Sequence, residues 1–129
     1  MLEKALILAA KAHTGQVDKG GAPYILHPIR VMLACEGEKE KIVALLHDTL
    51  EDTALTAADL RRAGFSEEIV QAVCCLTRGQ KEDYMDYIAR ICENALAARV
   101  KYADLQDNLD IRRIPNPTER DFARIRKYE

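Results

Sequence analysis

The sequence has neither a long apolar run nor an excess of positive charge. Its longest apolar stretches are far shorter than the roughly 20 residues that a membrane-spanning helix needs. Lysine and arginine number 19 against 21 aspartates and glutamates, so the net charge is −2. No overall positive field therefore favours binding to duplex DNA. We expect a cytoplasmic protein that binds neither DNA nor membranes.

Cysteine pairs with the spacing of a structural zinc site are also missing. The chain has four cysteines, Cys35, Cys74, Cys75 and Cys92, with no C-x-x-C pair among them. All four lie in apolar contexts. We therefore expect reduced cysteines packed in the core of a cytosolic protein, and neither a thiolate zinc site nor a disulfide framework.

Strand-like alternation of apolar and polar residues is absent as well, and nearly every segment has helical periodicity. Leu2, Leu6 and Ala9 form an apolar stripe at helical spacing that ends in His13. Glycines and a proline then mark a loop. Further helices are expected from Pro28 to near Gly37 and at about 38–51, 56–64, 66–77, 83–93, 95–112 and from Pro117 onward. At 129 residues, the chain is predicted to be one all-α domain, a compact helical bundle over residues 1–129.

The strongest functional signal is the change from apolar to acidic residues that begins at His47. An apolar helical run ends in His47 and Asp48, and Glu51 and Asp52 follow within one turn. If the helix continues through this segment, its carboxylates lie at the negative end of the helix dipole. Asp48 also faces like charges at i+3 and i+4. A cation would relieve this repulsion, and the adjacent histidine suggests a metal ion.

Two other segments offer partners for such an ion. His27 lies at the start of an expected helix, and Asp104 continues an inward stripe of Ala97 and Val100 that extends to Asn108. A buried carboxylate without a partner is costly, whereas a metal or a basic side chain removes the problem. Taken singly, each histidine of the chain is more often a hydrogen-bonded core residue than a ligand.

Two imidazoles and two carboxylates form a mixed nitrogen and oxygen ligand set, namely His27, His47, Asp48 and Asp104. Such a set suits Mn(II), Fe(II) or Co(II) and tolerates Zn(II). An ion with open positions can polarise a phosphate and lower the pKa of a bound water. Glu51 and Asp52 are candidates to orient or deprotonate that water, although a solvated helix end is the alternative interpretation.

The loop of residues 19–24 is a candidate anion site in front of His27. Its glycines let backbone N–H groups approach an anion, while Lys19 adds positive charge and Tyr24 a hydroxyl group. The Gly-Gly-x-Pro pattern by itself is that of an ordinary loop. Three further cations could add phosphate contacts, although a surface ion pair is the better interpretation of each: Lys101, Arg112 and Arg113.

Four ordered blocks together resemble the HD-domain phosphohydrolases, and within them the hydrolase domain of RelA/SpoT-type alarmone enzymes and their small stand-alone relatives. The blocks are AHTGQ at 12–16, GAPYILHP at 21–28, ALLHDTLEDT at 44–53 and ADLQDN at 103–108. The resemblance implies an all-α HD-domain bundle that removes pyrophosphate from the 3′ position of guanosine 3′,5′-bis(diphosphate) (ppGpp) or its pentaphosphate relative.

The resemblance also implies roles for single residues. The metal ligands, usually around Mn(II), would be His27, His47, Asp48 and Asp104. The water-activating pair would be Glu51 and Asp52, and the residues that position the nucleotide would be Lys19, Tyr24 and Asn108.

The chain departs from this family in two places. Asp18 stands where the family usually has an arginine that packs on the guanine ring, and an aspartate cannot make that cation–π contact. Asp107 stands where the family usually has histidine, and the sequence allows either a surface role or one behind the metal ligands. A different phosphorylated nucleotide or phosphoester is therefore the second hypothesis. A non-catalytic nucleotide-binding module is the third, although it would not need Glu51 and Asp52.

Overall fold

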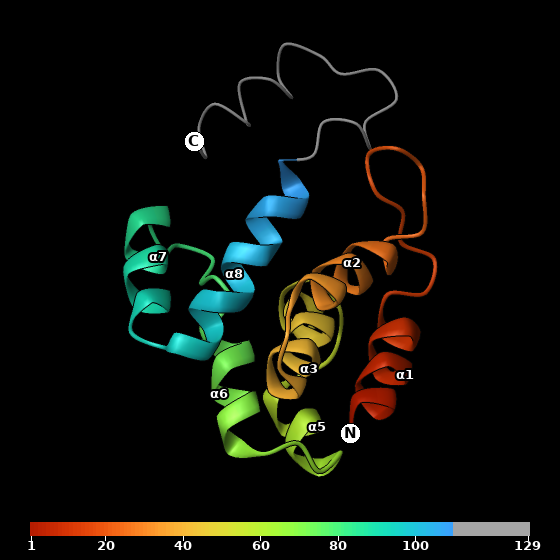
Figure 1. The fold of residues 1–129 in the computed structure, drawn as a ribbon, viewed down its shortest axis with the longest axis horizontal. Coiled ribbons are helices and arrows are strands. Elements are labelled where there is room, and N and C mark those ends of the chain that lie inside the picture. The colour runs from red at the N-terminus through yellow and green to blue at the C-terminus, as the bar shows by residue number, and fades with distance from the viewer. Residues whose placement is uncertain (110–129) are drawn as a thin grey trace.

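A computed structural model describes residues 1–109, and this part of the chain is helical, as predicted (Figure 1). Eight helices are found in it: α1 (Leu2–Ala12), α2 (Leu26–Ala34), α3 (Glu38–Leu46), α4 (Thr49–Asp52), α5 (Ala57–Arg62), α6 (Glu67–Cys75), α7 (Tyr84–Cys92) and α8 (Ala95–Asn108). Within residues 1–109, pairing between extended segments is limited to one isolated bridge between Val17 and Pro23. None of the described helices combines the length and apolar content that crossing a membrane would need.

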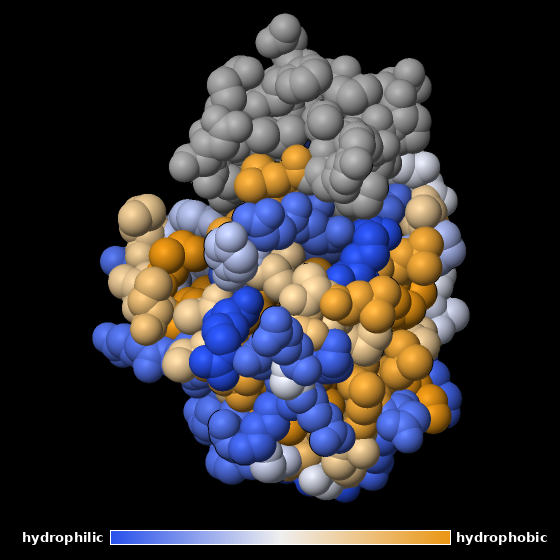
Figure 2. Space-filling view, viewed as in Figure 1, coloured by the Kyte–Doolittle hydropathy of each residue, from blue (hydrophilic) through white to orange (hydrophobic). Residues whose placement is uncertain are grey.

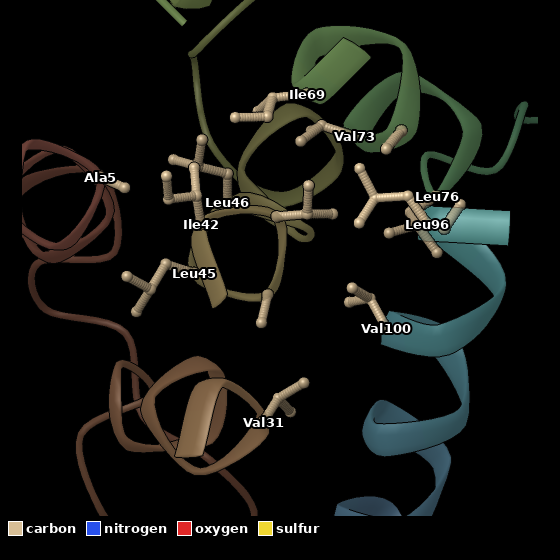
Figure 3. Close-up of a cluster of buried hydrophobic side chains, with 14 of the residues drawn as sticks. Ala5, Val31, Ile42, Leu45, Leu46, Ile69, Val73, Leu76, Leu96 and Val100 are labelled. Carbon is tan, nitrogen blue, oxygen red and sulfur yellow. The ribbon is translucent and has the colours of Figure 1, made fainter. Parts of the chain in front are cut away.

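Helix α3 lies at the centre of the bundle, where α1, α2, α6 and α8 pack around it (Figure 1). Its last five residues, 42–46, are all buried, and a helix that is apolar on every side belongs in the interior. Val31 of α2, Val73 of α6 and Val100 of α8 point toward α3 from three directions (Figure 3). This packing brings the end of α3 close to the start of α2 and the middle of α8.

Replacing Leu45 with alanine is expected to lower the free energy of unfolding by about 2–5 kcal/mol, the usual range for a cavity left in a close-packed core. Leu45 is fully buried, whereas Leu33 is 69% exposed. Leu33→Ala is therefore the matched control, and its expected change stays within about 0.5 kcal/mol. Urea unfolding followed by circular dichroism measures both. Equal effects of the two substitutions would contradict the central position of α3.

The predicted helix at 38–51 is wrong in one important respect. Helix α3 ends at Leu46, and the single-turn helix α4 begins at Thr49. Between them, Asp48 has φ −100° and ψ −1°, and the Thr49 hydroxyl donates to the Leu46 carbonyl at 2.8 Å, closing the bend. Asp48 therefore lies at the start of α4, directly after the C-cap residue of α3, and Glu51 and Asp52 belong to α4.

The predicted apolar stripe of α1 is also only partly correct. Ala5 and Ala9 are fully buried against the bundle, and His13 is buried as well. Leu6 is 37% exposed, whereas the two alanines belong to the core cluster that includes the buried residues of α3. Figure 2 shows hydrophobic side chains over α1 and α2 on the face seen there.

The expected helix starts are confirmed where a capping residue was recognised. Thr56 and Asp59 form a reciprocal capping box on α5, and the Ser66 hydroxyl accepts from the Ile69 N–H at the start of α6. Helix α6 ends at Cys75, slightly before the predicted Thr77. Helix α8 ends at Asn108, and the helix expected from Pro117 lies outside the described residues.

The prediction for the cysteines holds in part. All four are free thiols, in agreement with the expectation of reduced cysteines. Only Cys35 is buried in the core, however, whereas Cys74 and Cys75 are partly exposed and Cys92 is exposed. Cys92 is the last residue of α7. The prediction from its apolar sequence context, that it would be buried, is therefore wrong for this cysteine.

Candidate metal centre

Four side chains that are distant in sequence meet where α2, α3 and α8 come together. His27 lies in the first turn of α2, His47 and Asp48 occupy the bend after α3, and Asp104 lies one turn after Val100 on α8. The predicted inward stripe of α8 is confirmed as far as Asp104, since Ala97, Val100 and Asp104 are all buried, whereas Asn108 is partly exposed.

The potential ligand atoms converge on one point. The Nε2 atoms of His27 and His47 lie 2.8 and 3.3 Å from Oδ1 of Asp104, and ligand atoms of these three buried residues all lie within 4.8 Å of one another. Asp48 adds a fourth group, with Oδ2 at 3.1 Å from His47 Nε2 and 3.8 Å from His27 Nε2. This mixed nitrogen and oxygen set fits a divalent ion such as Mn(II), Fe(II), Co(II) or Zn(II).

Both imidazole rings are held from behind. His47 Nδ1 donates to the backbone carbonyl of Ala44 at 2.5 Å, and His27 Nδ1 donates to Oδ2 of Asp107 at 2.5 Å. A carbonyl or carboxylate oxygen accepts a proton at Nδ1, so Nε2 is the nitrogen left to face the centre. The sequence had left Asp107 with either a surface role or a role behind the metal ligands. Its contact with His27 favours the second role.

The charges of the cluster are strongly coupled. Burial alone would raise the pKa of Asp104, but hydrogen bonds from His27 and His47 hold it well below its ordinary value. Burial would also raise the pKa of Asp48, which the charge of His47 instead lowers to about 2. Burial would lower the pKa of His47, yet Asp48 and Asp104 hold it well above its ordinary value. The carboxylates are thus kept ionised in the interior, where a cation would be stabilised.

Tyr24 contacts the predicted ligands directly. Its hydroxyl donates to Oδ2 of Asp48, and its ring centroid lies 4.9 Å from that of His13 and 5.7 Å from that of His27. Burial and then the Asp48 charge raise the pKa of Tyr24 far above its ordinary value, so the hydroxyl stays a hydrogen-bond donor. Tyr24 therefore orients Asp48, in addition to the substrate role predicted for it.

A cavity of about 310 Å³ opens onto this cluster. It contains all three residues predicted to position a nucleotide, together with three of the four predicted ligands. Its lining is Asp18, Lys19, Gly20, Tyr24, His27, Arg30, Asp48, Lys101, Asp104 and Asn108. His47 lies behind this surface, only 3% exposed.

Two cations of this cavity were missed or undervalued from the sequence. Lys101 was assigned to a surface ion pair, but its side chain is only 17% exposed and its Nζ lies 3.1 Å from Oδ2 of Asp104. Arg30 enters the cavity from α2. The i+3 spacing of Lys101 and Asp104, and of His27 and Arg30, could have indicated both.

Glu51 and Asp52 lie beside the cluster but do not line the cavity. Oε1 of Glu51 accepts from the backbone N–H of Arg78 at 2.7 Å. Burial, then the charges of Asp48 and Glu51, raise the pKa of Asp52.

Asp18 has a clear structural role in the loop before α2. Its Oδ1 accepts from the backbone N–H groups of Gly20 and Ala22 at 2.9 and 3.0 Å. A short aspartate suits this local turn, whereas a long arginine could not make it. The carboxylate is therefore committed to the loop backbone.

Comparison with protein-family models gave no match, but several curated proteins are similar. The GTP pyrophosphokinase of Myxococcus xanthus is 30% identical over 97% of this chain and 18% of its own length. The bifunctional (p)ppGpp synthase/hydrolase SpoT of Escherichia coli is 32% identical over 84% of this chain and 17% of its own length. The chain thus spans less than a fifth of these relatives.

The guanosine-3′,5′-bis(diphosphate) 3′-pyrophosphohydrolase of Aquifex aeolicus is likewise 32% identical over 84% of this chain, and the match covers 17% of that protein. Among solved structures, a metazoan ortholog of SpoT that hydrolyzes ppGpp superposes with a TM-score of 0.80. It is 26% identical, and the match covers 98% of this chain and 78% of that one.

The helical fold and the converging histidines and aspartates make this chain a member of the HD-domain family. Within that family, the similarities in sequence and structure place it with the hydrolase domains of RelA/SpoT-type enzymes.

Proposed function

We propose that this chain is a metal-dependent phosphohydrolase that removes the 3′-pyrophosphate from ppGpp or a closely related nucleotide. The observation that carries the proposal is the convergence of two imidazoles and two carboxylates at a cavity that also holds cationic side chains. The relatives named as ppGpp 3′-pyrophosphohydrolases support the same reaction, as does the solved structure of a ppGpp-hydrolyzing protein.

The proposed ligands are His27, His47, Asp48 and Asp104, with Mn(II) as the leading metal. When bound there, a divalent ion supplies positive charge beside the phosphorus and acidifies a water molecule. Tyr24 and Asn108 hold ligand carboxylates: the tyrosine hydroxyl donates to Asp48, and Asn108 Nδ2 donates to Oδ1 of Asp104 at 3.3 Å.

The cations of the cavity suit a substrate that carries several phosphates. Lys19, Arg30 and Lys101 surround the space in front of the ligands. A guanidinium and two ammonium groups are side chains that bind phosphate oxygens. Substrate phosphates placed among these side chains would hold the 3′ phosphorus next to the metal ligands.

Asp52 is the proposed proton acceptor. In the reaction, a water oxygen bonds to the phosphorus attached to the ribose 3′ oxygen, the bond between that phosphorus and the 3′ oxygen breaks, and pyrophosphate leaves. The Asp52 carboxylate would take the proton that the water loses, because its raised pKa suits a general base. The 3′ oxygen takes up a proton from solvent and becomes a hydroxyl group, and Asp52 later returns its proton to solvent. Glu51 would act with Asp52 in orienting the attacking water, and its Oε1 also fixes the adjacent loop through the Arg78 N–H.

A second substrate class is favoured by one observation. The family's guanine-stacking arginine is replaced by Asp18, whose carboxylate is bonded to the loop backbone. Recognition of the base therefore depends on other residues, and a different phosphorylated nucleotide is the alternative substrate.

One experiment tests the proposal and separates the alternatives. Purified protein with added Mn(II) is incubated with ppGpp, its pentaphosphate relative and a panel of other phosphorylated nucleotides, and pyrophosphate or phosphate release is measured. Release from ppGpp that stops in excess EDTA supports the proposal. Faster turnover of another nucleotide would replace the substrate, and nucleotide binding without any turnover would favour a binding module. Full activity in EDTA would exclude the metal.

The pH dependence follows from the raised pKa of Asp52. A general base must be deprotonated, so kcat/KM is expected to fall as pH decreases through a pKa above the ordinary aspartate value. The Glu51 charge contributes to that raised pKa, so Glu51→Gln should move the acid limb of its residual activity to lower pH. Initial rates across the acid range, with circular dichroism as the folding control, measure this. An acid limb that stays in place in Glu51→Gln would contradict the coupling.

A further inference from the structure

His27 is held between two carboxylates from the same helix. On α8, Asp104 Oδ1 contacts Nε2 of His27 at 2.8 Å, and Asp107 Oδ2 contacts Nδ1 at 2.5 Å. The i+3 spacing places both carboxylates on one face of α8. The side chain of Asp107 is only 11% exposed, so its contact with the ring is shielded from water. One acid therefore lies on the metal side of the imidazole and the other behind it.

A third contact keeps Asp107 in this position. Arg30 Nε donates to Asp107 Oδ1 at 2.9 Å, and Arg30 follows His27 by one turn on α2. The two oxygens of Asp107 are thus directed to two side chains of the same helix. Rotation of the Asp107 carboxylate away from His27 would break both bonds. The chain of contacts runs from Arg30 through Asp107 to His27.

This arrangement has a chemical consequence for the proposed ligand. A neutral imidazole coordinates a metal through whichever nitrogen carries no proton, and a carboxylate behind one nitrogen keeps the proton there. The same acid also stops the ring from turning about its Cβ–Cγ bond. His47 obtains the equivalent contact from the Ala44 carbonyl, so backbone geometry fixes one histidine and a side chain fixes the other.

We propose that Asp107 is a positioning residue that sets the tautomer and orientation of His27 for metal binding, with Arg30 anchoring it. The inference rests on the metal centre of the proposed function. It concerns a residue at which this chain differs from the family, because Asp107 stands where the resemblance leads one to expect histidine. An ion pair that merely joins α2 to α8 is the simpler role, and the test must separate the two.

The matched control is a second ion pair that joins α8 to another helix. Arg99 of α8 contacts Glu40 of α3 at 2.5 Å, and Glu40 lies about two helical turns before His47. Glu40→Ala removes a carboxylate from an interhelical pair, as Asp107→Ala does, but leaves the contacts of His27 in place. Asp107→Asn is the conservative variant, since its amide oxygen still accepts from Nδ1. All three proteins are first compared by thermal melting without metal.

Two measurements then decide the matter. Isothermal titration with Mn(II) is expected to show a Kd about 10- to 100-fold weaker for Asp107→Ala, the usual effect of losing a partner behind a ligand. Asp107→Asn should lose less, and Glu40→Ala should bind like the wild type. In metal-free protein, where Asp104 also faces Nε2, the ring ¹⁵N shifts of His27 should report a hydrogen-bonded proton at Nδ1 in the wild type and the loss of that bonded proton in Asp107→Ala.

The inference is overturned if Asp107→Ala binds Mn(II) like the wild type and its His27 ¹⁵N shifts are unchanged. If Asp107→Ala does not fold, the same two measurements on Asp107→Asn decide, with the Arg30→Met variant as a second probe of the anchor. If the wild type binds no Mn(II), the proposed function fails, but a changed tautomer in Asp107→Ala would still support the positioning role. The two failures are therefore distinguishable.

Discussion

Replacing Asp48 with alanine is expected to abolish both Mn(II) binding and pyrophosphate release. The variant removes one of four converging ligands, whose Oδ2 lies 3.1 Å from His47 Nε2. It also removes the acceptor of the Tyr24 hydroxyl and one of the charges that stabilise a cation in this buried site. The loss should exceed the roughly 10- to 100-fold effect typical of residues behind the ligands, and titration calorimetry and the ppGpp assay measure it.

The control for this prediction is an exposed carboxylate elsewhere. Asp86 is exposed on α7, so Asp86→Ala should leave both Mn(II) affinity and turnover unchanged. Circular dichroism must show that Asp48→Ala keeps its helices. A folded Asp48→Ala protein that releases pyrophosphate at the wild-type rate would remove Asp48 from the centre and with it the ligand set proposed above.

The second large effect is expected from the acidic residues of α4. Asp52→Asn and Glu51→Gln should retain Mn(II) but lose turnover on the order of 10²-fold or more, the usual contribution of a proton-transfer group. These amide substitutions keep the shape of the side chains while removing the charge. In Glu51→Gln, the amide oxygen can still accept from the Arg78 N–H that Glu51 contacts, so the loss would reflect chemistry and not a displaced loop.

Separate titrations and rate measurements distinguish the possible outcomes. Unchanged Mn(II) affinity together with slow turnover supports the water-activating role. Loss of the metal in Asp52→Asn would instead make Asp52 a ligand, and wild-type rates in both variants would leave α4 without a catalytic role. Asp86→Asn, the same change at an exposed position, is the control for the amide substitution.

Much of the fold could be predicted from the sequence because its signals are local. The Thr56 capping box and the Ser66 cap mark helix starts within a few residues, and the stripe through Val100 to Asp104 marks a buried face. The break after Leu46 was missed, because an apolar run shows where a helix is buried but not where the chain bends. The hydroxyl of Thr49 that closes the bend has no signature in hydrophobic periodicity.

The candidate ligands could also be predicted from local sequence signals. The side chains that hold these ligands in place could not. An isolated histidine or a carboxylate on an apolar face is unusual enough to notice in the sequence, as at His47 and Asp104. The roles of Asp107 and Arg30 depend on the distance between α2 and α8, which only tertiary packing determines. Lys101 was misplaced for the same reason, since exposure of a lysine depends on the helices that surround it.

The buried polar cluster means that stability and function compete at the centre of this molecule. Apolar side chains of similar volume at His47 and Asp104 would avoid the desolvation of ionisable groups, and such replacements in protein interiors often leave the fold equally or more stable. Selection for resistance to unfolding alone would thus tend to erase the histidine and the aspartate that meet at 3.3 Å. The presence of both in the core, next to an entirely apolar α3 end, is the arrangement that a trade-off of stability for the proposed metal centre would produce.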